Sequence, residues 1–240
     1  LDVSVTQIEP NELLKAILRA PVDMIWNGGV GTFVKGTEET HGDAGDRAND
    51  AIRINGNELR SRVVCEGGNL GFTQLARIEY ELNGGKVNTD FIDNSAGVDC
   101  SDHEVNIKIL LNSIVATGDL TEKQRNALLV RMTDEVANLV LQNNYHQNQA
   151  ISLASFLSPH YITLYMRYLE EQEKNGKIDR ELEFLPDDKT LLERKSAGLG
   201  ITRPELSVLL AYSKIILEEN IRKSGLRKDP HLAQYVSKAF

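Results

Sequence analysis

The chain has 240 residues, of which 41% are hydrophobic and 26% are charged. This balance is typical of a globular protein that can bury a core, and the length allows one large domain or two small ones. The formal net charge of −8 argues against a broad surface for nucleic acid or acidic membranes, because binding a polyanion requires a concentrated basic face.

Cysteine content and the ends of the sequence bear on location. Cys65 and Cys100 are the only cysteines, so reduced thiols in the cytoplasm fit better than a disulfide framework. No apolar run approaches the roughly 20 residues that a membrane span needs, and no basic-then-apolar signal opens the sequence. The sequence begins at LDVSV without Met, and we expect it to be part of a longer polypeptide.

Strands and helices alternate over roughly the first 100 residues. Apolar spacing predicts a helix over 11–19 and a strand over 22–26, which ends at Asn27-Gly28-Gly29. A second β-like run at 30–34 and a polar loop or short surface helix at 36–50 follow.

The next segment is expected to contain a hairpin, two strands and a helix. Asn55-Gly56 predicts a small hairpin between 51–54 and 58–60. After it we expect a strand at 63–65, a helix at 72–82 closed by Asn83-Gly84-Gly85, and a third strand at 87–92.

Everything after Ser101 is predicted to be helical. Three segments have capping-box spacing: Ser101-x-x-Glu104, Thr121-x-x-Gln124 and Thr202-x-x-Glu205. The second should open a helix to about residue 141 and the third, with Pro204 in its first turn, a helix over 205–221. Further helices are expected at 153–168, at 191–194 ending near Gly198, and at 231–240, with a charged connector at 176–188.

The expected fold class is therefore α/β followed by all-α. The strand-to-helix turns favour an open parallel sheet in the first part.

Two polar, glycine-bearing turns carry the strongest functional signal. They follow the strands at 63–65 and 87–92, and such turns form the ligand crevice of an open parallel sheet. In the first, small residues let the backbone approach a ligand, and Asn69 offers both a donor and an acceptor. In the second, Asn94 leaves the strand and Ser101 begins a helix, whose free N–H groups favour an anion such as a carboxylate. The alternative is local: two turn-forming asparagines and a serine that only caps a helix.

Other candidate sites are weaker. A GxGxxG fingerprint is absent, and Gly28-Gly29-x-Gly31 is a poor relative because a β-like run follows it. The acidic loop with His41, Asp43, Asp46 and Asp50 matches no metal-ligand spacing, so we interpret it as solvated.

The remaining titratable residues have structural interpretations. His103 is expected to pack inside a helix, and Cys65 and Cys100 to be small core fillers rather than nucleophiles. The carboxylates around the crevice are interpreted mostly as caps and turn residues: Asp90, Asp93, Asp99, Asp102 and Glu104.

At these turns the sequence resembles the glutamate dehydrogenases. Small members of that family carry a strand followed by EGANGPTT, and later a strand followed by NAGGVVVSYFEW. Glu66-Gly67-Gly68-Asn69 aligns with the start of the first motif, with Gly68 in place of its Ala, and Thr73 matches its final Thr. The second motif aligns without a gap and places these residues on identical letters: Asn94, Gly97, Val98, Ser101 and Glu104.

The resemblance implies roles for these residues. Asn69 and Asn94 would contact NAD near its nicotinamide ribose and carboxamide, and Ser101 would hold a substrate carboxylate. The strand at 22–26 with its following turn would line the adenosine side. The implied cofactor-binding residues are thus Asn27, Gly28, Gly68, Asn69, Asn94 and Gly97.

Departures from the motifs narrow the resemblance. Gly71-Phe72 replaces a Pro-Thr pair, while Asp102-His103 and Val105 replace aromatic residues. With PVDMIWNGGVGTFVK and TRPELSVLLAYSK, these departures resemble the large bacterial NAD-specific glutamate dehydrogenases. In that class the catalytic region lies inside a much longer chain and is followed by a helical C-terminal region.

The resemblance implies an oxidoreductase, expected to be a homo-oligomer, that converts L-glutamate to 2-oxoglutarate and ammonia with NAD. The family's catalytic Lys and Asp and its glycine fingerprint would lie before residue 1. The resemblance thus implies that residues 1–118 are the C-terminal half of a dinucleotide-binding domain, with a partial doubly wound, Rossmann-like parallel sheet, and that residues 119–240 are an appended helical region. We therefore assign no catalytic or metal-binding residue and expect the chain by itself to be inactive.

Two alternatives remain open. The helical half could be a regulatory or assembly module of the same large enzyme. The chain could also be an unrelated nucleotide-binding module that shares only the fold. In addition, the strand at 22–26 is expected to be an exposed apolar edge, covered by self-association or by residues 30–34.

Overall fold

The computed structural model describes residues 7–232 and residue 235. The chain forms two compact units, one made of Leu1–Asn94 and Gln149–Ser213 and the other of Ser95–Asn148 and Lys214–Phe240. The helix predicted over 231–240 lies largely outside the described residues. Among those residues, no helix is long and apolar enough to cross a membrane.

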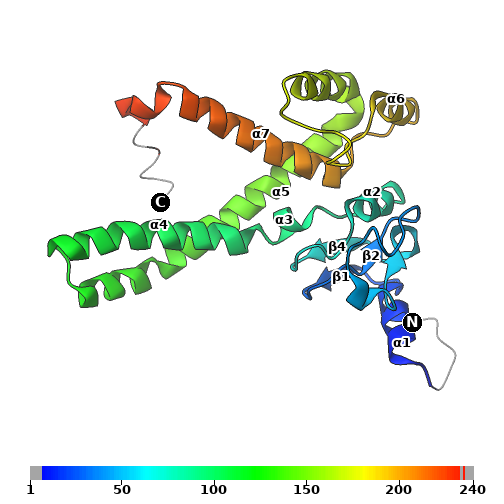
Figure 1. Cartoon of the computed structure of the whole chain (residues 1–240), viewed down its shortest axis with the longest axis horizontal. Helices are drawn as coiled ribbons and strands as arrows, with labels where there is room; N and C mark the ends of the chain where they lie inside the picture. The colour runs from blue at the N-terminus through cyan, green and yellow to red at the C-terminus, as the bar shows by residue number, and fades with distance from the viewer. Residues whose placement is uncertain (1–6, 233–234, 236–240) are drawn as a thin grey trace. The chain divides into compact units, whose positions relative to one another are not determined.

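The first part of the chain combines short strands with helices (Figure 1). The predicted helices at 11–19 and 72–82 are confirmed, and residues 36–50 are a loop with one 3-10 turn. In chain order the elements are α1 (Pro10–Leu18), β1 (Met24–Asn27), β2 (Val34–Lys35), η1 (Arg47–Asn49), β3 (Ile54–Asn55), η2 (Gly56–Glu58), β4 (Val63–Glu66), α2 (Gln74–Leu82) and α3 (Asp90–Asp93).

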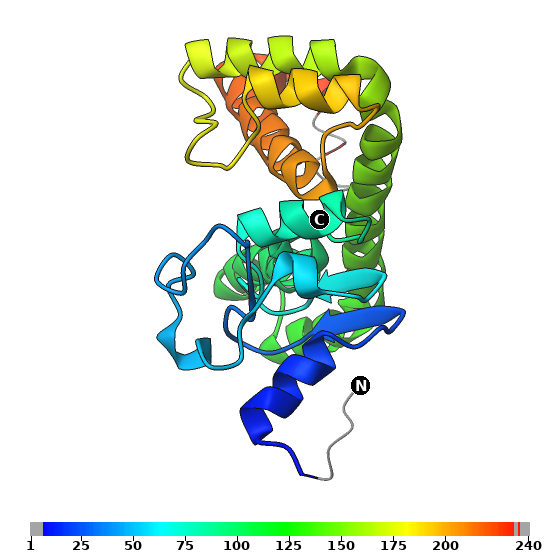
Figure 2. The same cartoon turned by 90° about the vertical axis from the view of Figure 1, so that its right-hand side faces the viewer.

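The strands form two parallel pairs. β1 pairs with β4 in a register that runs from Met24↔Val63 to Asn27↔Glu66, and Figure 2 shows these two strands side by side. β2 pairs with β3, also in parallel. The parallel arrangement agrees with the expectation from the sequence, and the carboxyl ends of β1 and β4 point to the same edge.

The predicted hairpin around Asn55-Gly56 is wrong. Asn55 and Glu58 instead form a capping box, in which the Asn55 backbone N–H donates to Glu58 Oε2 at 2.8 Å. This closes the 3-10 turn η2, and β3 pairs with β2 rather than turning back on itself. The β-like run at 30–34 likewise becomes strand only at its end, in β2.

The third strand predicted at 87–92 is also wrong. After α2 the chain returns beside β4 for a single bridge between Lys86 and Val63. It then turns at Thr89 into the short helix α3. Val87 is buried in one hydrophobic core and Ile92 in another, so the apolar run joins two cores instead of continuing along the sheet.

The strand β1 is an edge among the described residues, where its only partner is β4. Its side chains Met24 and Trp26 are 53% and 69% exposed. The expectation of an exposed apolar edge therefore holds, and residues 30–34 do not pair with it.

The remainder is helical, as predicted, but with different boundaries. The elements are α4 (Ser95–Thr117), α5 (Glu122–Lys174), α6 (Asp188–Ser196), α7 (Arg203–Lys223) and η3 (Leu226–Lys228). The two helices expected before and after residue 150 are one helix with a break at Tyr161. Pro159 lies just before the break, and proline removes a helical hydrogen bond.

The predicted capping box at Thr121 is confirmed, because its backbone N–H donates to Gln124 at 2.9 Å and its hydroxyl accepts the Gln124 N–H at 3.3 Å. At Thr202 half of the predicted box is present: Glu205 accepts the Thr202 N–H and also the Thr202 hydroxyl, both at 2.7 Å. The box at Ser101 is wrong, because α4 already begins at Ser95.

Within the first unit, the second core packs α6, the start of α7 and the later half of α5. Arg194 and Glu205 form a buried pair there, with N–O distances of 2.6 and 2.9 Å. The apolar members of this core include Ile92, Ile151, Ile162, Leu169, Leu191 and Leu206.

In the second unit, α4 and residues 122–148 form an antiparallel helical hairpin (Figure 1). Arg125 contacts Asn112 near the loop, and Asn144 donates to Ser95 at 2.9 Å at the other end. His103 is buried and lies 3.5 Å from Asp99, which confirms its interpretation as a packed histidine.

Candidate functional site

The turns that follow β1 and β4 touch each other through their backbones. The Asn27 carbonyl accepts hydrogen bonds from the N–H groups of Gly67 and Gly68, at 2.9 and 3.0 Å. A side chain at Gly68 would overlap the carbonyl oxygen of Gly29. Glycine is therefore required at position 68 for the two turns to approach this closely.

The two predicted asparagines meet beside this contact. Asn94, which caps α3, donates its Nδ2 to Asn69 Oδ1 at 2.6 Å and to the Gly68 carbonyl at 3.4 Å. Their hydrogen bond leaves the amide nitrogen of Asn69 and the amide oxygen of Asn94 available to other groups. Together these atoms offer one donor and one acceptor, which is the complement of a carboxamide.

Leu70 occupies an unusual backbone conformation in the turn after β4. Its φ is 55°, in the left-handed region, where a non-glycine residue costs roughly 1–2 kcal/mol. Its N–H donates to Asp90 Oδ2 and its carbonyl accepts from Thr32 Oγ1, both at 2.7 Å. These two hydrogen bonds hold the turn in shape while the Leu70 side chain remains 64% exposed.

A buried ion pair spans the same turn. Glu66 accepts two hydrogen bonds from Arg77, at 2.6 and 2.9 Å, and a third from the Phe72 N–H at 3.1 Å. Asp90 lies 3.3 Å from the same guanidinium. Burial raises the pKa of Glu66, and the Arg77 guanidinium opposes that effect. The pair fixes both ends of the turn, because Glu66 begins it and its side chain holds Phe72 at the other end.

Asp93 ties α3 to the end of β4. It accepts the Glu66 backbone N–H at 2.9 Å and the Asn88 side-chain amide at 2.8 Å. Burial raises the pKa of Asp93, and these hydrogen bonds oppose the shift. Asp90 and Asp93 were interpreted from the sequence as local caps, but they bind the turn of another element. Their spacing on α3 was the available signal, since i and i+3 share one helix face.

Cys65 lies next to this carboxylate. Burial and the nearby Asp93 raise the pKa of the Cys65 thiol to about 11. It is therefore protonated at neutral pH, which argues against a nucleophile. The prediction that Cys100 fills a core is wrong, because Cys100 is exposed on α4.

The turn after β1 combines a buried amide with an open glycine. The Asn27 amide nitrogen is buried without a hydrogen-bond partner in the described part of the chain. Gly28 has no atom within 4 Å of the position that a side chain would occupy. The buried Asn27 nitrogen instead packs against Gly71, where an added side chain would overlap it, so this donor belongs to the contact between the two turns and does not face the open space at Gly28.

Gly97 and Ser101 lie on α4, in the other compact unit. Ser101 is exposed and six residues inside its helix. The expectation that it begins the helix is wrong, and the favourable effect of a helix N-terminus on an anion falls off within the first turn. A role for Ser101 must therefore rest on its hydroxyl alone.

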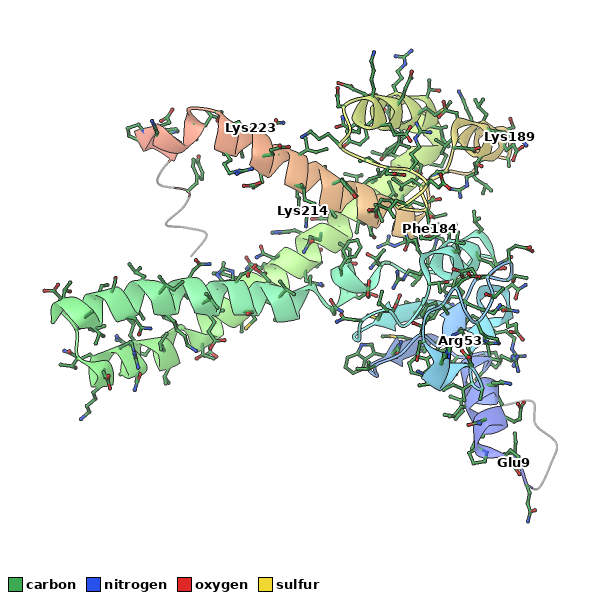
Figure 3. The ribbon with its side chains drawn as sticks, in the orientation of Figure 1. Glu9, Arg53, Phe184, Lys189, Lys214 and Lys223 are labelled. Atoms are coloured by element: carbon green, nitrogen blue, oxygen red, sulfur yellow. The ribbon has the colours of Figure 1, made fainter. Side chains whose placement is uncertain are left out.

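The acidic loop before β3 is organised around Arg53, which is labelled in Figure 3. Its buried guanidinium donates to Asp50 at 2.5 Å and to the Thr32 carbonyl at 2.7 Å, and lies 2.9 Å from His41 Nδ1. Asp46 accepts the Thr32 N–H at 2.8 Å. These groups thus hold one another and position Thr32, which contacts the turn after β4.

Two family models match the chain. The model for the catalytic domain of bacterial NAD-glutamate dehydrogenase matches residues 1–154, and the model for the glutamate dehydrogenase C-terminal region matches residues 198–240. The chain belongs to the bacterial NAD-glutamate dehydrogenase family.

Three similar relatives carry the name NAD-specific glutamate dehydrogenase. The protein from Pseudomonas aeruginosa is 59% identical over 239 residues, and that from Halomonas elongata 56% identical over 234 residues. The protein from Mycobacterium tuberculosis is 45% identical over 245 residues. The matches cover 100%, 98% and 100% of this chain but only 15%, 14% and 15% of the relatives.

Proposed function

We propose that the chain forms one wall of the crevice that binds NAD and substrate in an enzyme that oxidatively deaminates L-glutamate to 2-oxoglutarate and ammonia. The observation that carries this proposal is the Asn69–Asn94 pair, which lies beside two glycine-bearing turns at the carboxyl ends of parallel strands. The names of the relatives supply the reaction and the cofactor.

The residues of the crevice would bind and orient the dinucleotide. NAD supplies the hydride acceptor when bound, and the protein supplies position and electrostatics. The free amide edges of Asn69 and Asn94 would hold the nicotinamide side. Asn27 and Gly28 would line the adenosine side, and Gly68 would keep the turns close enough to form one wall.

Two residues of α4 are also assigned by the resemblance. We assign Gly97 to the cofactor and the Ser101 hydroxyl to a substrate carboxylate, both exposed on this helix. The family's catalytic Lys and Asp would come from other parts of a polypeptide as long as the relatives, so the chain by itself is expected to show no turnover with glutamate and NAD.

The finer organisation is also proposed. Residues 1–118 would complete a Rossmann-like cofactor domain and residues 119–240 would form the helical region. The parent enzyme would be a cytoplasmic homo-oligomer.

Kinetics of single variants test the site, in a polypeptide of the relatives' full length. Asn69→Ala and Asn94→Ala should each raise the Michaelis constant for NAD about tenfold, the effect of losing about 1.4 kcal/mol of binding. Ser101→Ala should instead raise the Michaelis constant for glutamate. Asn83→Ala, which changes an exposed asparagine at the end of α2, is the matched control. The assignments fail if the site variants behave like this control.

One observation favours a second candidate, an assembly role for the helical region. Large apolar side chains are exposed on both helices of the α4–α5 hairpin, among them Ile109 and Leu110 on α4 and Val130 and Leu141 on α5. Exposed apolar surface of this kind marks an interaction site. A truncation ending near Gly118 discriminates, because lost assembly with unchanged NAD affinity would support this role.

A further inference from the structure

Arg203, the first residue of α7, joins the helical segments of the first unit to its α/β part. Its backbone N–H donates to Glu81 Oε2 at 2.6 Å, at the end of α2. Its guanidinium donates through Nε to Asn88 Oδ1 at 2.9 Å and through Nη1 to Ser152 Oγ at 3.0 Å. The residue therefore contacts α5, α2 and the segment before α3 at the same time.

The contact with Asn88 continues toward the crevice. Asn88 donates its Nδ2 to Asp93 Oδ1 at 2.8 Å, and Asp93 Oδ2 accepts the Glu66 backbone N–H at 2.9 Å. Asn94 follows Asp93 directly, and Asn69 lies three residues after Glu66. Three hydrogen bonds thus lead from α7 to the two segments that carry the asparagine pair, the turn after β4 and the end of α3.

The direction of each hydrogen bond is fixed by chemistry. An arginine only donates and a carboxylate only accepts, so the Asn88 amide has a single orientation that satisfies both neighbours. Asn88 and Asp93 are largely buried, and in a low dielectric an unsatisfied polar group is costly. Any displacement of Arg203 must therefore be followed by Asn88, Asp93 or both.

Packing alone does not account for this arrangement. The apolar core around Ile92, Ile151 and Leu206 already joins the helical segments to α3, without a polar link. The polar chain instead ends on the N–H group that opens the turn after β4.

We propose that Arg203 and Asn88 are positioning residues, through which α7 sets the geometry of the Asn69–Asn94 pair toward the nicotinamide half of NAD. This rests on the proposed function of that pair. It gives the helical region a part in cofactor binding, separate from assembly.

The test uses a polypeptide of the relatives' full length and two small changes. Asn88→Asp keeps the acceptor for Arg203 but turns a carboxylate toward Asp93, so the link is broken at one atom. Arg203→Lys keeps the charge but cannot donate to Asn88 and Ser152 with the same planar geometry. We expect each variant to raise the Michaelis constant for NAD about tenfold, while that for glutamate changes less than twofold.

The control is Lys195→Ala. Lys195 donates to Thr163 at 3.0 Å within the helical segments and takes no part in the chain of contacts to the crevice. This control should leave both Michaelis constants unchanged. Direct titration with NADH provides a second readout for variants with low yield.

A purely structural role predicts a lower melting temperature and less active enzyme with both Michaelis constants unchanged, and that result overturns the proposal. Asn69→Ala and Asn94→Ala keep the two hypotheses apart. Suppose that Asn69→Ala and Asn94→Ala raise the Michaelis constant for NAD, whereas Asn88→Asp and Arg203→Lys leave it unchanged. In that case only the positioning role fails. If all four leave it unchanged, the proposed function of the asparagine pair fails first.

Discussion

Removing one partner of the Glu66–Arg77 pair should cost several kilocalories per mole of folding free energy, because the other charge stays buried. The Glu66 side chain is fully buried and that of Arg77 is 5% exposed. Glu66→Gln leaves a buried guanidinium whose remaining partners are Asp90, at 3.3 Å, and the Gln74 side-chain oxygen, at 3.2 Å. Breaking a buried pair on one side typically costs 3–5 kcal/mol, and since Asp90 remains, we expect about 3 kcal/mol.

Replacing the arginine of the pair should cost a similar amount. Arg77→Leu leaves Glu66 buried and removes two of its three hydrogen-bond donors, so that only the Phe72 N–H remains. The double variant removes both charges, so its cost should be about 1–3 kcal/mol smaller than the sum of the single costs.

Urea unfolding, followed by far-UV circular dichroism and by the emission of Trp26, measures these free energies. Trp26 is the only tryptophan and lies opposite Cys65, next to the turn in question. Arg180→Leu is the control, because Arg180 is also largely buried with two carboxylates but lies in the connector before α6. If the costs of the two single substitutions sum to the cost of the double variant within about 0.5 kcal/mol, the two groups do not interact and the reasoning is wrong.

Three further outcomes follow from the site. Gly68→Ala should destabilise the chain by at least about 1 kcal/mol in urea unfolding, because its methyl group would meet the neighbouring turn; wild-type stability would show that the turns can separate freely. Burial raises the pKa of Glu81 from 4.5 to about 7, so its neutral form stabilises the fold fully below about pH 4.5 and this contribution is lost as the pH rises through 7. Glu81→Gln, which can still accept from Arg203, should therefore be more stable than wild type at pH 8, by at most about 3 kcal/mol, with a flatter pH profile between 4.5 and 7; an unchanged profile would contradict the shift. Alkylation at pH 8, read by peptide mass spectrometry, should modify exposed Cys100 before Cys65, whose thiolate is scarce.

The sequence predicted the elements that depend on local signals. The strands β1 and β4, the helix α2 and the helix starts at Thr121 and Thr202 follow from apolar spacing and from side chains that bond three residues away. The parallel pairing followed from the alternation of strand and helix. Asn69 and Asn94 were expected in one crevice, and the structure brings their side chains to 2.6 Å; their role toward NAD remains a prediction.

The errors arise where long-range contacts decide the conformation. The run from Val87 to Ile92 has the apolar content of a strand, but its two ends are buried in different cores. Ser101 has the spacing of a cap, but the helix begins earlier, because the hairpin with α5 extends α4 back to Ser95. The ion pair of Glu66 and Arg77 joins a strand to a helix, and no local pattern reveals such a partner.

The parallel pairing of β1 with β4 also affects how the chain is made. Met24 pairs with Val63, so β1 emerges from the ribosome when its partner strand is still 39 residues behind it. At about 5–20 residues per second, this leaves β1 unpaired for about 2–8 s in each round of synthesis. During that interval an apolar strand that remains an edge even in the folded chain is open to chaperones and to other nascent chains. The yield of soluble protein should therefore depend on the rate of translation between β1 and β4.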